Sequence, residues 1–249
     1  MALIGICAGT LGSLIGVGGG IVITPILTFI GLPPAVVAST SLYAVVSTSL
    51  SASISYFRQK KIIYELALKL SFTSIPGSVA GVFISSFIPT DSFKILFALI
   101  LVTSGVYILY KKSMTSKDKE NRKIDLFDIL LFFSLSFLAG VISSLFGVGG
   151  GIIFVPIMII ILNVSMYYTS ATSQFALLLT SVTGLLVHSY FGHPNLLYAL
   201  PLSIGAFLGG QIGSHLINKV NEKILRKLLS LTLFIVAIRL SLDALNVNF

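Results

Sequence analysis

Residues 16–20 read GVGGG, and residues 147–151 read GVGGG again. The stretches around them also agree: GSLIGVGGGIVITPIL at 12–27 matches SSLFGVGGGIIFVPIM at 143–158. Glycine in a helix interior costs about 1 kcal/mol relative to alanine, so four glycines in five residues predict a break in a helix. A proline follows each cluster, Pro25 or Pro156, and we expect it a short way into the next half-helix.

The surroundings of both clusters are apolar. The chain is 55% hydrophobic and 10% charged, with a mean hydropathy of +1.03, whereas about 25% of the residues in a soluble domain are charged. Apolar segments long enough for a bilayer recur from end to end, at residues 2–31, 34–57, 66–88, 93–110, 127–162, 166–191, 196–217 and 224–245. We therefore expect an all-α, multi-pass protein of the cell membrane, in which the breaks are enclosed by protein or face a watery cavity.

The repeat extends beyond the glycine clusters. Residues 39–41 match residues 171–173 at an offset of 132, and the pair Gly77/Gly81 matches Gly205/Gly209 at an offset of 128. We interpret the paired glycines as close helix packing through small residues. The sequence thus predicts a first transmembrane repeat over 1–110, a charged cytoplasmic linker over 111–123, and a second transmembrane repeat over 124–249.

The basic residues predict how the segments cross the membrane. Fourteen of the 16 fall in three clusters, at residues 58–69, 111–123 and 219–227. Lys and Arg favour cytoplasmic loops. If all eight segments cross the membrane once, 11 basic residues lie on one side and 5 on the other. If the first and fifth segments instead enter and return at GVGGG, 14 lie on one side and 2 on the other. The second arrangement agrees better with the preference of Lys and Arg for the cytoplasmic side. It makes the two halves inverted repeats, each a re-entrant broken-helix hairpin followed by three transmembrane helices.

A broken helix exposes backbone N–H groups, and the following half-helix directs its positive end at the break. Such a site binds anions without a formal charge, and glycine lets the ligand approach the backbone closely. Hydroxyl and amide side chains of the next helix in each half add further donors. The candidate substrate-binding residues are Gly16, Gly18, Gly19, Gly20, Thr40, Ser41, Gly147, Gly149, Gly150, Gly151, Thr172, Ser173 and Gln174.

Other chemistries find little support in the sequence. Three scattered histidines and one cysteine form no plausible metal cluster, no P-loop or dinucleotide motif is present, and no acid–base pair lies in an apolar segment. We therefore expect no enzyme activity, no cofactor and no bound metal. The basic residues lie between apolar segments, so we expect lipid contact rather than nucleic acid. We interpret His188 as interfacial and Cys7 as a small packing residue, with a gating or reactive role as the alternative.

Two copies of G-x-G-G-G with a proline five residues on, each followed by a Thr-Ser pair in the next segment, resemble the TauE/SafE (TSUP, DUF81) family of membrane transporters. The resemblance covers essentially the whole chain. It implies a permease or exporter of sulfur-containing anions such as sulfite, thiosulfate, sulfoacetate or other organosulfonates. The two halves differ where the second has Gln174 and the first has Leu42, which suits an asymmetric anion such as a sulfonate with a second polar group.

The expected mechanism is alternating access of two inverted halves around one small-anion site. A passive small-anion channel and a non-transporting membrane interaction protein with tight glycine packing remain as alternatives. The predicted spans consist mostly of Ile, Leu, Val and Phe, with polar residues gathered near the breaks. That distribution favours an occluded site over a continuous polar pore. The sequence leaves the individual anion, the direction of transport, the coupling ion and the oligomeric state open.

Overall fold

The computed structural model describes residues 1–110, 126–162 and 164–221, together with single positions between 224 and 238. The predicted linker at 111–123 and much of the eighth apolar segment lie outside the described residues. The longer helices are α3 (Pro34–Arg58), α4 (Tyr64–Ser85), α5 (Thr90–Tyr110), α6 (Leu126–Phe146), α8 (Met166–Tyr190) and α9 (Leu196–Leu216). The shorter ones are α1 (Ala2–Ile15), α2 (Gly20–Phe29), α7 (Gly151–Ile160) and the 3-10 turn η2 (Ile217–Lys219).

Both glycine clusters break a helix, as predicted. The first break separates α1 from α2, and the second separates α6 from α7. Pro25 lies within α2 and Pro156 within α7. The breaks contain backbone conformations that favour glycine, with φ of +80° at Gly16, +82° at Gly18, +68° at Gly147 and +83° at Gly149.

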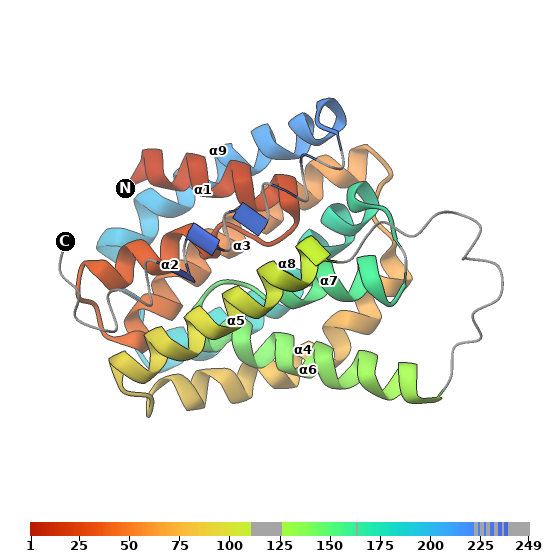
Figure 1. Ribbon diagram of the computed structural model, residues 1–249. Helices are drawn as coiled ribbons and strands as arrows, with labels where there is room; N and C mark the ends of the chain where they lie inside the picture. Colours follow the sequence, from red (N-terminus) through yellow and green to blue (C-terminus); the bar gives the residue numbers. More distant parts are fainter. Residues whose placement is uncertain are drawn as a thin grey trace.

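Two helix pairs, α1 with α2 and α6 with α7, enter the molecule and return. In Figure 1, α1 runs inward from the end that holds the N-terminus, and α2 leads back toward that end. The pair α6 and α7 does the same from the opposite end. Helices α3, α4 and α8, and α9 extended to Lys219, have the length and apolar composition of membrane spans. Each break therefore lies in the interior, between long helices.

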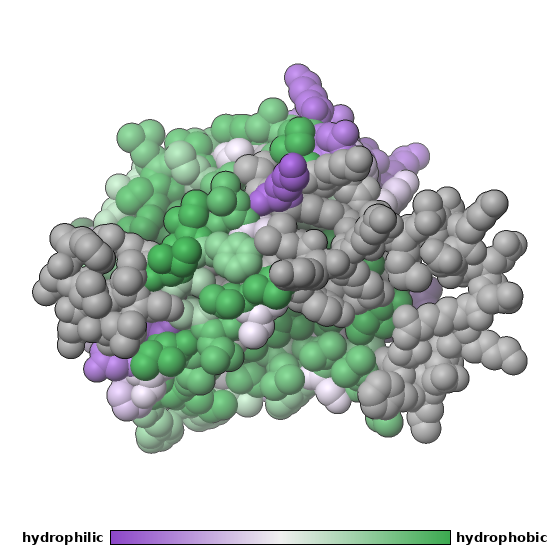
Figure 2. Space-filling view, in the orientation of Figure 1, coloured by the Kyte–Doolittle hydropathy of each residue, from purple (hydrophilic) through white to green (hydrophobic). Residues whose placement is uncertain are grey.

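The outer surface is apolar between the two ends. Figure 2 shows hydrophobic residues across most of the described part of this face, with hydrophilic ones at its upper right and lower left. Large apolar side chains are exposed on the protein, for example those of Phe72, Leu186 and Leu197. Apolar patches of this extent are typical of a surface in contact with lipid, so the fold is that of a multi-pass membrane protein.

Glycines let the helices of the two halves approach closely. Helix α1 packs on α9 and α6 packs on α4. A Cβ atom added to Gly77 would lie 2.1 Å from the Phe137 carbonyl oxygen, and one added to Gly209 would lie 2.3 Å from that of Ile6. The packing role predicted for these glycines is confirmed. The contacts correspond at an offset of 132, so Gly77 is equivalent to Gly209; the alignment at 128 was wrong by one helical turn.

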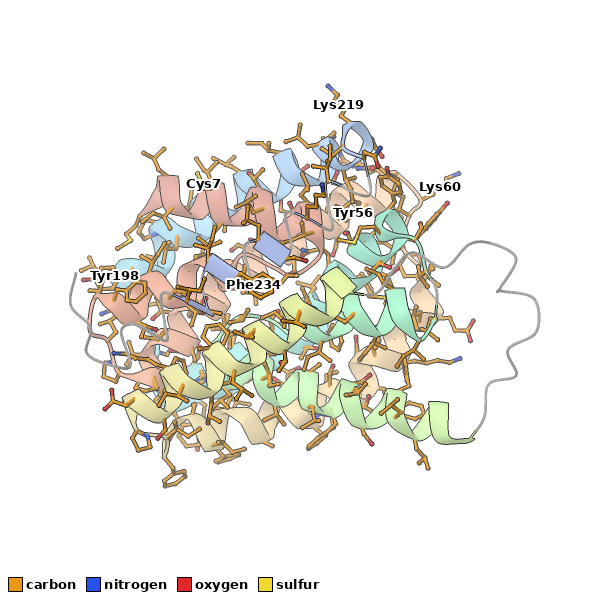
Figure 3. All side chains as sticks on the ribbon, in the orientation of Figure 1. Cys7, Tyr56, Lys60, Tyr198, Lys219 and Phe234 are labelled. Carbon is orange, nitrogen blue, oxygen red and sulfur yellow. The ribbon has the colours of Figure 1, made fainter. Side chains whose placement is uncertain are left out.

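Four single residues show how the surface is arranged. Lys60 and Lys219 lie at one end of the molecule, while Tyr198 lies at the other (Figure 3). Two of the three basic clusters therefore share one end, as the arrangement with returning segments requires. Cys7 is exposed on α1, so it does not act as a small packing residue between helices of the protein: this position of α1 faces outward, away from α9.

Candidate functional site

The two helix breaks meet in the interior of the protein. A Cβ atom on Gly20 would lie 2.3 Å from the carbonyl oxygen of Gly147, and one on Gly151 would lie 2.5 Å from that of Gly16. All four residues are buried. Backbone from one half therefore lies directly against backbone from the other.

Two helices begin at this contact. Gly19 is the N-cap of α2 and Gly150 is the N-cap of α7, and neither N-terminus is capped by a side chain. The first-turn amides of a helix have no acceptor within it, and the helix dipole places partial positive charge there. The centre of the molecule therefore holds two positively polarised helix ends, one from each half.

Apolar side chains cover the breaks. A Cβ atom on Gly149 would lie 2.9 Å from Cδ2 of Leu177 and 3.1 Å from Cγ1 of Val45. One on Gly18 would lie 3.3 Å from Cγ1 of the same valine and 3.5 Å from Cδ1 of the same leucine. Val45 belongs to α3 and Leu177 to α8. These two side chains close the space next to the break backbone.

Three of the predicted polar residues lie at the breaks. Ser41 Oγ is hydrogen-bonded to Thr24 Oγ1 (3.1 Å), and that threonine also donates to the Phe146 carbonyl oxygen (2.9 Å) at the end of α6. Ser173 Oγ donates to the Gly16 carbonyl oxygen (2.6 Å). Gln174 Nε2 donates to the Gly12 carbonyl oxygen (2.8 Å). Ser173 thus contacts the break formed by the other half directly, whereas Ser41 is linked to the other half through Thr24.

The other two predicted residues face a different partner. Thr40 Oγ1 accepts a hydrogen bond from the N–H of Asn195 (3.0 Å), the N-cap of α9. Thr172 Oγ1 accepts one from the N–H of Ile63 (3.1 Å), the N-cap of α4. The Thr-Ser pairs are therefore split: the serines face the breaks, and the threonines hold the start of a helix in the other half.

We expect Thr40→Val and Thr172→Val each to lower stability by about 1–3 kcal/mol, because each leaves a backbone N–H without its acceptor. Thr40→Ser and Thr172→Ser retain the hydroxyl and are expected to restore most of that loss. The midpoint of thermal aggregation in detergent, followed by size-exclusion chromatography, measures the effect. Valine variants as stable as the serine variants would contradict this role.

One pair of contacts next to the breaks was missed in the sequence. The Tyr56 hydroxyl donates to the Ser13 carbonyl oxygen (2.9 Å), and His188 Nε2 lies 3.0 Å from the Ser144 carbonyl oxygen. Both bonds hold the last turn of the helix that precedes a break. The repeat could have indicated both contacts, because the offset of 132 aligns Tyr56 with His188.

His188 lies in the last turn of α8, at one end of a helix of membrane-spanning length. Its side chain is fully buried, because the adjacent loop folds back over the end of α8. His188 Nδ1 lies 2.9 Å from Nδ1 of His193 in that loop. Partial burial lowers the pKa of the His193 side chain from its ordinary value. Among the described residues, no group of His, Cys, Asp and Glu has a geometry that could hold a metal ion.

Comparison with known proteins gives one consistent result. The chain matches the family model described as Sulfite exporter TauE/SafE over residues 1–240. It is 30% identical to the probable membrane transporter protein YunE of Bacillus subtilis, over 96% of each chain. It is 28% identical to the probable membrane transporter protein MJ0441 of Methanocaldococcus jannaschii, over 92% of this chain and 90% of that one. No solved structure matches the chain.

Proposed function

The chain belongs to the TauE/SafE sulfite exporter family of membrane transporters, and from this premise we propose that it carries a small sulfur-containing anion such as sulfite, thiosulfate or an organosulfonate across the cell membrane. The observation that carries the proposal is the meeting of two uncapped helix N-termini at the buried contact between the glycine breaks. Partial positive charge from both halves suits an anion.

We assign different roles to the polar residues. The backbone at Gly16–Gly20 and Gly147–Gly151, with Ser41, Ser173 and Gln174, forms the anion site. Thr40 and Thr172 keep α9 and α4 in place. A sulfur oxyanion presents several acceptor oxygens, which match backbone N–H and hydroxyl donors, and sites of this kind recur at half-helix ends in secondary transporters.

We propose alternating access as the mechanism. Val45 and Leu177 cover the break backbone from α3 and α8, so the anion reaches the amides only after these helices shift. The same contacts recur in both halves, and this supports two equivalent units that move relative to each other. A passive channel would instead need a continuous polar path past these two apolar side chains.

The inverted arrangement of the halves is part of the proposal. It puts residues 59–63 and 217–221 on the cytoplasmic side and the turn after α4 on the opposite side. In a protein whose Cys7 is replaced by serine, we expect Lys60→Cys and Lys219→Cys to react with a membrane-impermeant maleimide only in inside-out vesicles. Ser86→Cys, in an exposed turn, is expected to react only in intact cells. Ser86 and Lys219 stand at nearly equivalent positions of the two halves, so labelling of Ser86→Cys and Lys219→Cys from one side would contradict the inverted arrangement.

Counterflow in proteoliposomes tests the function. Vesicles loaded with unlabelled sulfite are expected to accumulate labelled sulfite transiently above equilibrium, because a carrier exchanges anions through one site. A channel gives uptake without that overshoot. Thiosulfate and organosulfonates in the external medium are expected to compete, and chloride is not. If no sulfur anion is exchanged, the proposed function is wrong.

A further inference from the structure

The amide of Gln174 is fixed at the first break. Its nitrogen donates to the Gly12 carbonyl oxygen, which also accepts from the N–H groups of Val17 (3.0 Å) and Gly18 (3.2 Å). The side chain is fully buried. The amide oxygen Oε1 is bound to the same carbon as the fixed nitrogen, so it also lies at the break.

This oxygen lacks a hydrogen-bond donor. Six buried side-chain polar atoms in the described part of the chain have no partner, and Gln174 Oε1 is the one amide oxygen among them; the others are hydroxyls. A hydroxyl can rotate and either donate or accept, whereas an amide oxygen only accepts. A buried acceptor without a donor is costly, so native structures seldom retain one without a reason.

The other half offers no counterpart. At the offset of 132, Leu42 stands where Gln174 stands. In the alignment of 12–27 with 143–158, Ser143, whose hydroxyl has no partner, stands where Gly12 stands. The acceptor therefore belongs to one side of the contact between the breaks, next to helix ends that favour negative charge. A ligand that satisfies both must be an anion that also carries a hydrogen-bond donor.

We infer that Gln174 selects anions that carry a donor, such as a protonated sulfur oxyanion or a sulfonate with a hydroxyl or amino group. The inference rests on the proposed function, which supplies the anion site. The nitrogen of Gln174 stays on Gly12, so the donor of the substrate pairs with Oε1. Sulfonates of the same size without a donor leave Oε1 unsatisfied and bind more weakly.

The test compares hydroxyethanesulfonate with propanesulfonate, which differ by a hydroxyl in place of a terminal methyl group. In competition against labelled sulfite on the purified protein, we expect hydroxyethanesulfonate to bind about tenfold more tightly. Gln174→Leu, which introduces the residue that the first half carries, is expected to abolish this preference. Elution of the variant as a monodisperse peak in size-exclusion chromatography would demonstrate that it is folded. Ser143→Ala serves as the control and is expected to keep the preference.

The possible results separate the inference from the proposed function. Equal binding of the two sulfonates by the unaltered protein, or a preference that survives in Gln174→Leu, would overturn the inference alone. If the unaltered protein binds neither sulfonate nor sulfite, both the proposed function and the inference are wrong.

Discussion

Gly147→Ala is expected to leave little folded protein, whereas Gly192→Ala leaves most of it. The two glycines have nearly the same backbone conformation, with φ of +68° and +69°. An added Cβ at Gly147 would lie 2.3 Å from the Ala38 carbonyl oxygen, while at Gly192 nothing lies within 4 Å. Both variants place alanine in a left-handed backbone conformation, which destabilises the protein by about 1–2 kcal/mol. Gly147→Ala also pushes the second break away from α3, and overpacking of this kind costs about 1–3 kcal/mol more.

The yield of monodisperse protein and the midpoint of thermal aggregation in detergent measure this difference. The backbone strain is the same in both variants. The additional loss of yield and stability in Gly147→Ala therefore measures the contact between the break and α3. Similar midpoints for the two variants would mean that the breaks are not packed as described, and the close contact between the halves would then lose its support.

Gly18→Ala is expected to fold but to lower sulfite counterflow about tenfold or more. The added methyl group would meet Val45 Cγ1 at 3.3 Å and Leu177 Cδ1 at 3.5 Å, and these side chains can adjust. It would nevertheless stand over the break where the anion must approach the backbone amides. Loss of one hydrogen bond to a charged ligand weakens binding by about 1.5–3 kcal/mol, which is about tenfold or more.

Gly31→Ala is the matched control for this variant. Its φ of +84° is close to the +82° of Gly18, and nothing lies within 4 Å of an added Cβ. Both variants therefore carry the same strain, and only Gly18→Ala obstructs the break. Equal counterflow by the two variants at equal amounts of folded protein would remove Gly18 from the anion site.

The repeat and the helix breaks could be predicted because their signals are local. Clustered glycines disfavour a continuous helix wherever they stand, so Gly16–Gly20 was recognised without any tertiary information. The packing of Gly77 and Gly81 was predicted from a different local signal, two glycines four residues apart on one face of a helix. Gly140 was missed, although a Cβ there would lie 1.9 Å from the Ser74 carbonyl oxygen, because a single glycine does not stand out from an apolar segment. Gly5 and Gly9 have the spacing of Gly77 and Gly81 and could have been recognised by the same signal.

The partners of the polar side chains could not be predicted in this way. Which helix faces Thr40 depends on where α9 begins, some 155 residues later. The burial of His188 depends on a loop that turns back over its own helix. Exposure of Cys7 depends on which face of α1 packs on α9. Each of these follows from long-range packing, which the order of residues within one helix does not specify.

The stoichiometry of sulfite binding tests the central claim most directly, namely that the two breaks form one anion site. Equilibrium binding of labelled sulfite to the purified protein is compared with binding to Gly18→Ala and Gly149→Ala. We predict one anion per chain, with binding weakened by either substitution alone, because both halves contribute to the same site. Two anions per chain, or binding that either variant leaves unchanged, would contradict the account.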